Sequence, residues 1–305
     1  QQGFRFCFFF CKLVQFSGWS HGHSDCLLVD SVSGLMPAGI PGSAGVPEGC
    51  TRDTLTAEYN NLSSVEQLFE ANPGEIAAVI VEPLAANMGV VLPEEDFLPG
   101  LRKLCDREKA LLIFDEVITG FRLAFGGAAE KFGVTPDLVT YGKIIGGGMP
   151  VGAYGGRKEI MEMVAPLGPV YQAGTLSGNP VAMAAGLTQL QLLYEHPEYY
   201  KDLEKKGEKL YGSMERLVRE YDAPCTVNHL ASLGCVFFTE RRVRNYEDAK
   251  ASDTEEFARY FRWMLERGIH LAPSQFEAMF LSDAHSDENI EETLSVFEDY
   301  LKQRK

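Results

Sequence analysis

Two continuous apolar runs, each ending in an acid, most strongly constrain the fold of this chain. They are Ala77-Ala-Val-Ile-Val-Glu82 and Ala110-Leu-Leu-Ile-Phe-Asp115. A run without polar alternation is typical of a strand that is buried on both faces of a parallel sheet. Residues 97–109 between the runs have helical spacing, and residues 138–141 predict a further strand. This alternation predicts an α/β fold with a mostly parallel sheet.

The part of the chain after Pro197 differs in character from the part before it. Its charged segments have helical spacing, and short apolar segments lie between them. The pattern predicts a large domain over residues 1–197 and a small α+β domain over residues 198–305. In the small domain we expect helices at 200–221, 254–267 and 286–302, and strands at 232–239 and 269–273.

Residues 19–57 are rich in Gly, Pro and Ser and show no periodicity. A connection of that length inside a compact domain is usually functional or disordered. We therefore interpret it as a lid or substrate loop. A short helix over residues 63–71 is expected next, with Ser63 as its N-cap.

Net charge and cysteine pattern exclude several classes of function. The formal net charge of −15 argues against a surface that binds nucleic acid or an anionic membrane. The seven cysteines contain no C-x-x-C pair, so neither a disulfide framework nor a zinc ribbon is expected. The apolar segment 3–11 is too short to span a bilayer. We expect a cytoplasmic protein with reduced thiols.

Lys143 stands between the strand expected at 138–141 and a run of three glycines, 146–148. We expect this lysine to be buried, and desolvation lowers a lysine pKa. A neutral amine can then attack a carbonyl and form a Schiff base. Asp115 ends an upstream strand, and one helix and one strand fit between the two residues, which brings both to the carboxyl edge of the sheet. A Schiff-base lysine and an Asp on the pyridinium nitrogen are the protein contacts expected for pyridoxal phosphate (PLP).

Two other kinds of site fit parts of this pattern less well. The glycines after Lys143 suggest a nucleotide loop, but Ile144 stands where a P-loop has Ser or Thr. Close backbone packing or positive φ also explains these glycines. His21-Gly-His23-Ser-Asp25 has the ligand spacing of metallo-hydrolases, but no further ligand set completes it. We therefore expect no metal.

From about Lys12 onward, the chain resembles the class-III aminotransferases, which are PLP-dependent enzymes of fold type I. The stretches that carry this resemblance are 81–89, 114–122, 142–156, 172–180 and 273–278. Within the family, Asn87-Met-Gly89 and Ser274-Gln-Phe-Glu277 are similar to the glutamate-1-semialdehyde 2,1-aminomutases. The resemblance implies a large domain with a mostly parallel sheet and a small α+β C-terminal domain.

The resemblance also implies roles for single residues. Lys143 would bond to the cofactor and later move protons, and Asp115 would pair with the pyridine nitrogen. Asn87 would lie near the phenolic oxygen of the cofactor, and Glu277 near the reacting amine. Thr175 would reach the cofactor phosphate of the neighbouring subunit, so a homodimer is implied.

The long loop would lie beside the cofactor ring and the substrate. The resemblance places His21 and Ser33 in this loop and makes residues 23–51 a mobile lid. Where the family has a Tyr that stacks on the ring, this chain has Ser20. Trp19 is the neighbouring aromatic residue that would have to replace it.

The implied reaction is an internal exchange of an amino group, which makes the enzyme an isomerase. It starts from the pyridoxamine phosphate (PMP) form of the cofactor. It converts glutamate-1-semialdehyde to 5-aminolevulinate, a precursor of tetrapyrroles such as porphyrins. A class-III ω-aminotransferase, which needs an external amino donor, and an inactive fragment of the same fold remain as alternatives.

The family's region upstream of Lys12 has no counterpart in this chain. In the family it holds a Ser/Thr turn at a helix N-terminus, which binds the cofactor phosphate, and an arginine for the substrate carboxylate. We therefore expect the chain to be the downstream part of a longer protein and to retain its cofactor weakly. A transit peptide before Gln1 would change the expected location from the cytoplasm to a plastid.

Overall fold

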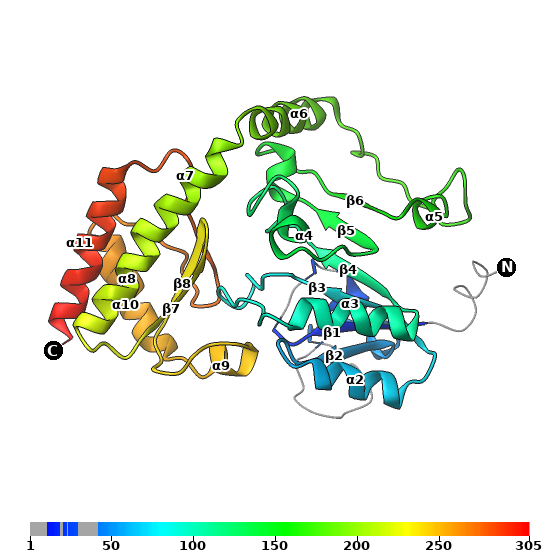
Figure 1. The fold of residues 1–305 in the computed structure, drawn as a ribbon, viewed down its shortest axis with the longest axis horizontal. Coiled ribbons are helices and arrows are strands. Elements are labelled where there is room, and N and C mark those ends of the chain that lie inside the picture. The colour runs from blue at the N-terminus through cyan, green and yellow to red at the C-terminus, as the bar shows by residue number, and fades with distance from the viewer. Residues whose placement is uncertain (1–10, 19–20, 23, 30–41, 305) are drawn as a thin grey trace. The chain divides into compact units, whose positions relative to one another are not determined.

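The computed structural model describes residues 11–18, 21–22, 24–29 and 42–304 (Figure 1). Two compact units divide the chain. The first comprises Gln1–Pro83 and Glu95–His196, and the second comprises Leu84–Glu94 and Pro197–Lys305. The sequence pattern did not indicate that residues 84–94 belong to the second unit. Each unit contains its own β-sheet.

The first unit is built on a six-stranded sheet in the order β2-β1-β3-β4-β5-β6. The first five strands in this order run parallel, and β6 is antiparallel to β5. The two apolar runs form the adjacent strands β3 and β4, so the predicted α/β fold with a mostly parallel sheet is confirmed. The strands are β1 (Lys12–Phe16), β2 (Thr54–Ala57), β3 (Ile76–Val81), β4 (Leu111–Asp115), β5 (Leu138–Tyr141) and β6 (Ala153–Gly156).

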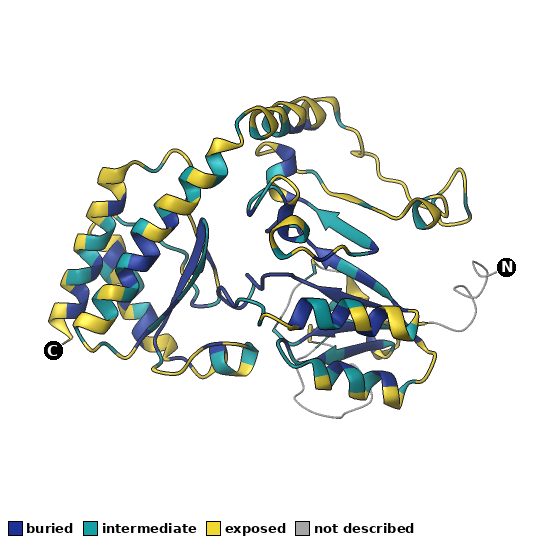
Figure 2. Cartoon of the chain, in the orientation of Figure 1, coloured by how far each residue is buried: buried dark blue, intermediate teal, exposed yellow. Residues whose placement is uncertain are grey.

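Helices and short 3-10 turns connect these strands or follow the last of them. They are η2 (Asp25–Leu27), α1 (Glu48–Thr51), α2 (Leu62–Ala71), α3 (Phe97–Glu108), α4 (Gly127–Phe132), η3 (Lys143–Gly146), α5 (Lys158–Met161) and α6 (Pro180–Glu195). Helices α2 and α3 lie side by side, and β3 is almost wholly buried (Figures 1 and 2). The rings of Phe16 on β1, Tyr59 and Phe97 of α3 pack edge to face, with centroid distances between 4.9 and 6.1 Å.

Two local predictions for the first unit are wrong. The N-cap of α2 is Asn61 rather than Ser63, because the Asn61 side chain accepts a hydrogen bond from the Ser64 N–H at 3.2 Å. The loop expected over 19–57 ends earlier than predicted, because Thr54–Ala57 pairs in parallel with β1. A four-residue strand is too short to show a period in the sequence.

The second unit contains a three-stranded antiparallel sheet, β7 (Thr226–Leu230), β8 (Leu233–Phe237) and β9 (Met279–Phe280). The strand predicted at 232–239 is confirmed as β8. Residues 269–273 form no strand, so that prediction is wrong. The edge of β8 pairs instead with β9, through Leu233 with Phe280 and Gly234 with Met279.

The three helices predicted for the second unit are all present. The first runs as α7 (Glu198–Gly207), the π-helical turn η4 (Glu208–Gly212) and α8 (Ser213–Glu220), and the others are α10 (Thr254–Glu266) and α11 (Asp287–Gln303). A short α9 (Tyr246–Lys250) precedes α10. Ser286 caps α11 in a reciprocal capping box with Asn289. None of the helices in the described part of the chain is long and apolar enough to cross a bilayer.

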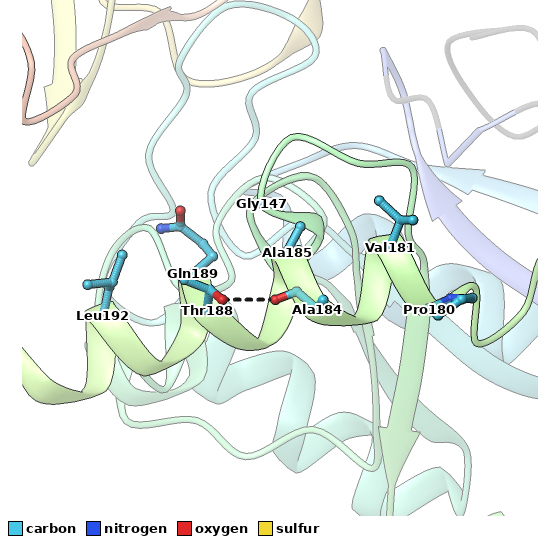
Figure 3. A pocket seen from close by; sticks show the side chains of 8 residues that line it. All are labelled: Gly147, Pro180, Val181, Ala184, Ala185, Thr188, Gln189 and Leu192. Carbon is cyan, nitrogen blue, oxygen red and sulfur yellow. Dashed lines mark hydrogen bonds between the residues drawn. The ribbon is translucent and has the colours of Figure 1, made fainter.

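Helix α6 is exposed along most of its length (Figure 2). Its apolar side chains include Val181 at 60%, Leu187 at 61% and Tyr194 at 73% exposure. A depression of about 720 Å³ runs along the helix, lined mainly by small and apolar α6 residues and by Gly147 (Figure 3). None of the residues that line it carries a charge. The depression is therefore an apolar surface rather than a place for acid–base chemistry.

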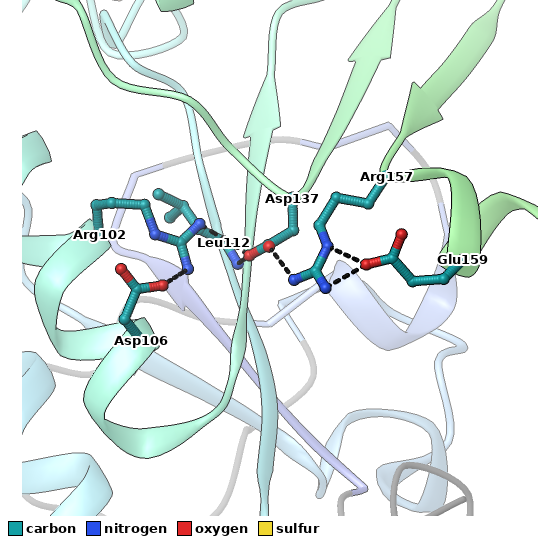
Figure 4. A network of polar contacts seen from close by, with 6 residues as sticks. All are labelled: Arg102, Asp106, Leu112, Asp137, Arg157 and Glu159. Carbon is teal, nitrogen blue, oxygen red and sulfur yellow. Dashed lines mark hydrogen bonds and ion pairs between the residues drawn. The ribbon is translucent and has the colours of Figure 1, made fainter. Parts of the chain in front are cut away.

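Asp137, just before β5, joins three parts of the first unit. Its carboxylate accepts hydrogen bonds from the Leu112 N–H at 2.8 Å and from Arg102 Nη1 at 2.8 Å. A third bond comes from Arg157 Nη1 at 3.0 Å (Figure 4). Burial raises the pKa of Asp137, but these donors outweigh burial and hold the pKa below its ordinary value. The carboxylate thus stays ionised and ties α3, β4 and the residue after β6 together.

Replacing Asp137 with Asn should lower the free energy of unfolding of the first unit by about 1–3 kcal/mol, because two charge-assisted bonds are lost. The folded pKa lies below the ordinary value of about 3.9. The stabilisation is therefore complete above about pH 4 and is lost as pH falls through the folded pKa. Urea unfolding at several pH values measures both effects. Glu159→Gln, which removes only an exposed partner of Arg157, is the control and should change little; an equal loss in both variants would contradict the prediction.

Candidate active site

Asp115 is the last residue of β4 and lies at the carboxyl end of the parallel sheet. Ligands of open α/β sheets bind at this edge. In the pairing of β4 with β5, Asp115 lies opposite Thr140. The side chain of Asp115 is 10% exposed. The fold therefore places a nearly buried carboxylate at the edge where the sequence predicts the cofactor site.

Three donors surround the Asp115 carboxylate. His21 Nδ1 lies 2.6 Å from Oδ2, and because a carboxylate can only accept, this nitrogen carries the proton. The other oxygen, Oδ1, accepts from the Val117 N–H at 3.1 Å and from Thr140 Oγ1 at 3.3 Å. Burial raises the pKa of Asp115, but the bond and charge of His21, with the other two donors, bring it below the ordinary value. Asp115 is therefore ionised at neutral pH.

Lys143 follows β5 and opens η3, so it lies at the same edge of the sheet as Asp115. The turns after β4 and β5 pack closely, because a Cβ on Gly142 would lie 3.2 Å from Cγ1 of Val117. Lys143 itself has φ +49°, an uncommon conformation for a residue with a side chain. Such backbone strain often marks functional sites.

The expected burial of Lys143 is wrong for the single chain, where the residue is exposed. In η3 the buried residues are Ile145 and Gly146 instead. They pack against α6, where a Cβ on Gly186 would lie 2.2 Å from the Ile145 carbonyl oxygen. Gly147 has φ +56°, and a Cβ on it would lie 2.6 Å from the Ala185 carbonyl oxygen of α6. Close packing and positive φ therefore account for the glycines here, and the lysine is left on the open side.

Glu116, the neighbour of Asp115, is wholly buried and has a structural role. It accepts hydrogen bonds from the N–H groups of Ala128 and Ala129, at 2.6 and 3.0 Å, at the start of α4. Burial raises its pKa, and these bonds offset the rise only in part. A Cβ on Gly127 would lie 2.2 Å from Oε2, so only glycine fits there. The sequence analysis did not predict this role of Glu116. The available signal was the Asp115-Glu116 pair followed by the glycines 126 and 127 at the start of α4.

Thr175, which the sequence assigned to a neighbouring subunit's phosphate, is exposed in the segment between α5 and α6. The segment ends at Asn179, whose side chain caps α6 by accepting from the N–H groups of Val181 and Ala182 at 3.0 and 3.2 Å. The helix therefore begins at Pro180. The predicted residues Trp19, Ser20 and Ser33, and residues 23 and 30–41 of the expected lid, lie outside the described residues.

Asn87 and Glu277 belong to the second unit. Their two turns meet there, because the Gly89 N–H donates to the Phe276 carbonyl at 2.7 Å. Asn87 is half-buried and Glu277 is exposed. The roles of both residues in a reaction stay predictions.

The residues at the edge of the first sheet fit PLP. An ionised carboxylate held in a nearly buried position suits a protonated pyridine nitrogen, and a primary amine lies at the end of the next strand. The roles of Asp115 and Lys143 toward the cofactor stay predictions. Among the residues that the structure describes, no group of three or more His, Cys, Asp or Glu could hold a metal; His23 lies outside them.

Comparison with known proteins agrees with this chemistry. A family model described as aminotransferase class-III matches residues 10–301. Glutamate-1-semialdehyde 2,1-aminomutase 2 from Lachnoclostridium phytofermentans is 62% identical over 291 residues, which cover 95% of this chain and 68% of that protein.

Solved structures give the same relationship. An omega-transaminase from Sphaerobacter thermophilus matches with a TM-score of 0.87 and 31% identity, covering 96% of this chain and 68% of that one. A glutamate-1-semialdehyde-aminomutase from Pseudomonas aeruginosa in complex with PMP matches with a TM-score of 0.81 and 25% identity, covering 96% and 66%. The chain thus spans about two thirds of the length of these proteins. From the family match along nearly all its residues and from these identities, the chain belongs to the class-III aminotransferase family.

Proposed function

We propose that the chain carries the activity of a glutamate-1-semialdehyde 2,1-aminomutase, a PLP-dependent isomerase that forms 5-aminolevulinate. The observation that carries this proposal is the pair of Asp115 and Lys143 at adjoining strand ends, within a sequence 62% identical to an aminomutase. The substrate is glutamate-1-semialdehyde, and its amino and carbonyl groups exchange positions within one molecule.

Each residue at the sheet edge has a distinct part in this reaction. When bound, PLP or PMP supplies a ring that withdraws electrons from the substrate carbon. Asp115, kept ionised by His21 and Thr140, accepts the N–H of the ring nitrogen and holds positive charge there. Lys143 Nζ takes the proton from one substrate carbon and returns it to the other. The exposure of Lys143 leaves this amine accessible to both positions.

Asn87 and Glu277 are proposed as the contribution of the second unit. The amide of Asn87 would hydrogen-bond the phenolic oxygen of the cofactor. Glu277 would accept a hydrogen bond from the reacting amine. Their support is that neither residue is buried and that the turns carrying them hydrogen-bond to each other.

An ω-aminotransferase of the same family is the second candidate, because an omega-transaminase matches the fold with a TM-score of 0.87. The two activities differ in one requirement. An aminotransferase needs an external amino donor, whereas an aminomutase uses the amino group of its substrate. The third candidate, an inactive fragment of the same fold, predicts that PLP does not become attached to Lys143.

In an assay with PLP or PMP and glutamate-1-semialdehyde but no amino donor, we expect the chain to form 5-aminolevulinate. Asp115→Ala and Lys143→Ala should each lower the rate by about 100-fold or more, because each removes a preorganised group at the reacting centre. Lys158→Ala, in the exposed helix α5, is the matched control and should retain the wild-type rate. Product that appears only after an amino donor is added would favour the aminotransferase. If borohydride reduction attached no cofactor to Lys143, the fragment reading would hold.

The pH dependence of the turnover rate should also depend on the hydrogen bond between His21 and Asp115. The pKa of Asp115 is low because His21 opposes the effect of burial, so removing His21 should raise that pKa. The acid limb of the pH–rate profile should then move to higher pH in His21→Gln, which loses the charge, and further in His21→Ala, which loses the bond as well. His270→Gln, an exposed residue of the second unit, is the control. An acid limb at the same pH in all four proteins would contradict this role of His21.

We further propose that two copies of the chain associate through α6. The supporting observation is the run of exposed apolar side chains along this helix, including Val181, Leu187 and Leu192. Contiguous apolar surface of this kind marks interaction sites. A second copy is the proposed occupant, since Thr175, expected to act on a neighbouring subunit's phosphate, is exposed just before the helix.

Leu187→Glu should convert the dimer to a monomer, because it would bury a charge in the apolar contact. Light scattering after size-exclusion chromatography measures the mass. Leu265→Glu is the matched control, because Leu265 is an exposed leucine of α10 in the second unit, at 46% exposure. A dimer that persists in Leu187→Glu, or a wild-type chain that is monomeric at all concentrations, would refute association through α6.

A further inference from the structure

The segment 85–91 folds back on itself within the second unit, and we name it the Asn87 turn. Ala85 and Val91 exchange two backbone hydrogen bonds, at 3.2 and 2.9 Å. Every residue between them is buried except Asn87, which is half-buried. Gly89 has φ +81°, a conformation that favours glycine. Asn87 is thus the one residue between Ala85 and Val91 that is not buried.

Residues 274–277 form a second turn, which we name the Glu277 turn. The Phe276 N–H donates to Ser274 Oγ at 3.2 Å, and the Glu277 N–H donates to the Ser274 carbonyl at 3.1 Å. Gln275 is 2% exposed, whereas Glu277 is exposed. This turn therefore has an exposed charged residue, Glu277, two positions after a buried residue, Gln275.

The two turns are held in contact at Gly89. Its N–H donates to the Phe276 carbonyl at 2.7 Å. A Cβ on Gly89 would lie 2.4 Å from the ring of Phe237 and 3.0 Å from Cys235 Sγ, both on β8. The Asn87 turn therefore lies directly on β8 and against the Glu277 turn.

Gln275 fixes the Glu277 turn to the same strand. Its side-chain Nε2 donates to the Val236 carbonyl of β8 at 2.7 Å. The Cys235 thiol donates to the Gln275 backbone carbonyl at 3.5 Å, a weak bond through sulfur. Burial raises the pKa of Cys235 to about 12, so this thiol keeps its proton. One buried residue thus binds β8 through both its side chain and its backbone.

We infer that Gln275 is a positioning residue that sets the place of Glu277, and through Gly89 that of Asn87, for the proposed reaction. The inference rests on the proposed function for its effect on rate. The bond between Nε2 and Val236 fixes the Glu277 turn on β8. The bond from Gly89 to Phe276 then transmits that placement to the Asn87 turn.

The alternative is that Gln275 only fills space in the core. Met has a similar length and would fill that space without desolvating an amide. The amide Oε1 of Gln275 is buried and accepts no hydrogen bond in the described part of the chain, which is itself costly. Besides filling volume, the amide therefore supplies the hydrogen bond to the Val236 carbonyl. Gln275→Met keeps the volume and loses this bond, so it separates positioning from space filling.

The first test is hydrogen exchange of the full chain, with and without PLP, read at the Gly89 amide by mass spectrometry. In Gln275→Met the Glu277 turn should open more often, so the Gly89 amide should exchange about tenfold faster or more. Tyr300→Phe is the matched control, because it removes one buried side-chain bond to Glu256 in the same unit. Its Gly89 exchange should stay within about twofold of wild type.

The second test is a double-mutant cycle on the rate of 5-aminolevulinate formation. Gln275→Met should lower kcat by about tenfold or more at a temperature where circular dichroism shows a folded chain. In the Glu277→Gln background the loss of kcat caused by Gln275→Met should be clearly smaller, because only the placement of Asn87 then remains to be disturbed. Tyr300→Phe should leave kcat unchanged in either background.

Unchanged Gly89 exchange in Gln275→Met would overturn the inference, and so would independent, multiplying losses of kcat in the double variant. If the wild-type chain forms no 5-aminolevulinate, the proposed function fails. The exchange experiment, which needs no turnover, then still decides whether Gln275 holds the two turns. A lower melting temperature with wild-type kcat and wild-type exchange would identify Gln275 as a filling residue only.

Discussion

The carboxylate of Asp115, ionised although nearly buried, is the feature on which the rest of the site depends. Removing such a charge from water is costly unless donors replace the water. The donors here come from three places: the segment after β1 supplies His21, the turn after β4 supplies Val117, and β5 supplies Thr140. They meet only because these strands run parallel, so that their carboxyl ends share one edge. The topology of the sheet thus maintains the charge.

Three buried acids of the first unit, Asp115, Glu116 and Asp137, show how hydrogen-bond partners set the pKa of a buried carboxyl group. Asp137 and Asp115 both have a lowered pKa, yet two arginines saturate Asp137, whereas Asp115 has a histidine and neutral donors. Glu116 has a raised pKa and holds the start of α4. Asp115 is the one of these three that combines lasting ionisation with a place at the ligand-binding edge. Neighbouring acids whose environments push their pKa values apart are typical of sites with assigned roles.

The sequence was sufficient where a signal is local. Unbroken apolar runs predicted β3 and β4, and helical spacing over residues 286–302 predicted α11. The shared edge of Asp115 and Lys143 followed from parallel order alone. The exposure of Lys143 did not, because it depends on η3 turning Ile145 toward α6. The choice of Asn61 over Ser63 as a cap likewise depends on which side chain the backbone brings within reach of Ser64.

The placement of Asn87 beside the Glu277 turn was beyond any local pattern, since the two residues lie 190 positions apart in the sequence (277 − 87). The bond from Gly89 to Phe276 creates this contact, and it exists because β8 offers both turns a common surface. Polar side chains at a site are therefore only as well placed as the buried residues next to them. In the second unit these residues are a glycine that no larger residue can replace and a glutamine with one directed bond. Motifs such as Asn-Met-Gly and Ser-Gln-Phe-Glu thus contain, besides the residue that we propose to face a ligand, a buried neighbour that fixes the turn.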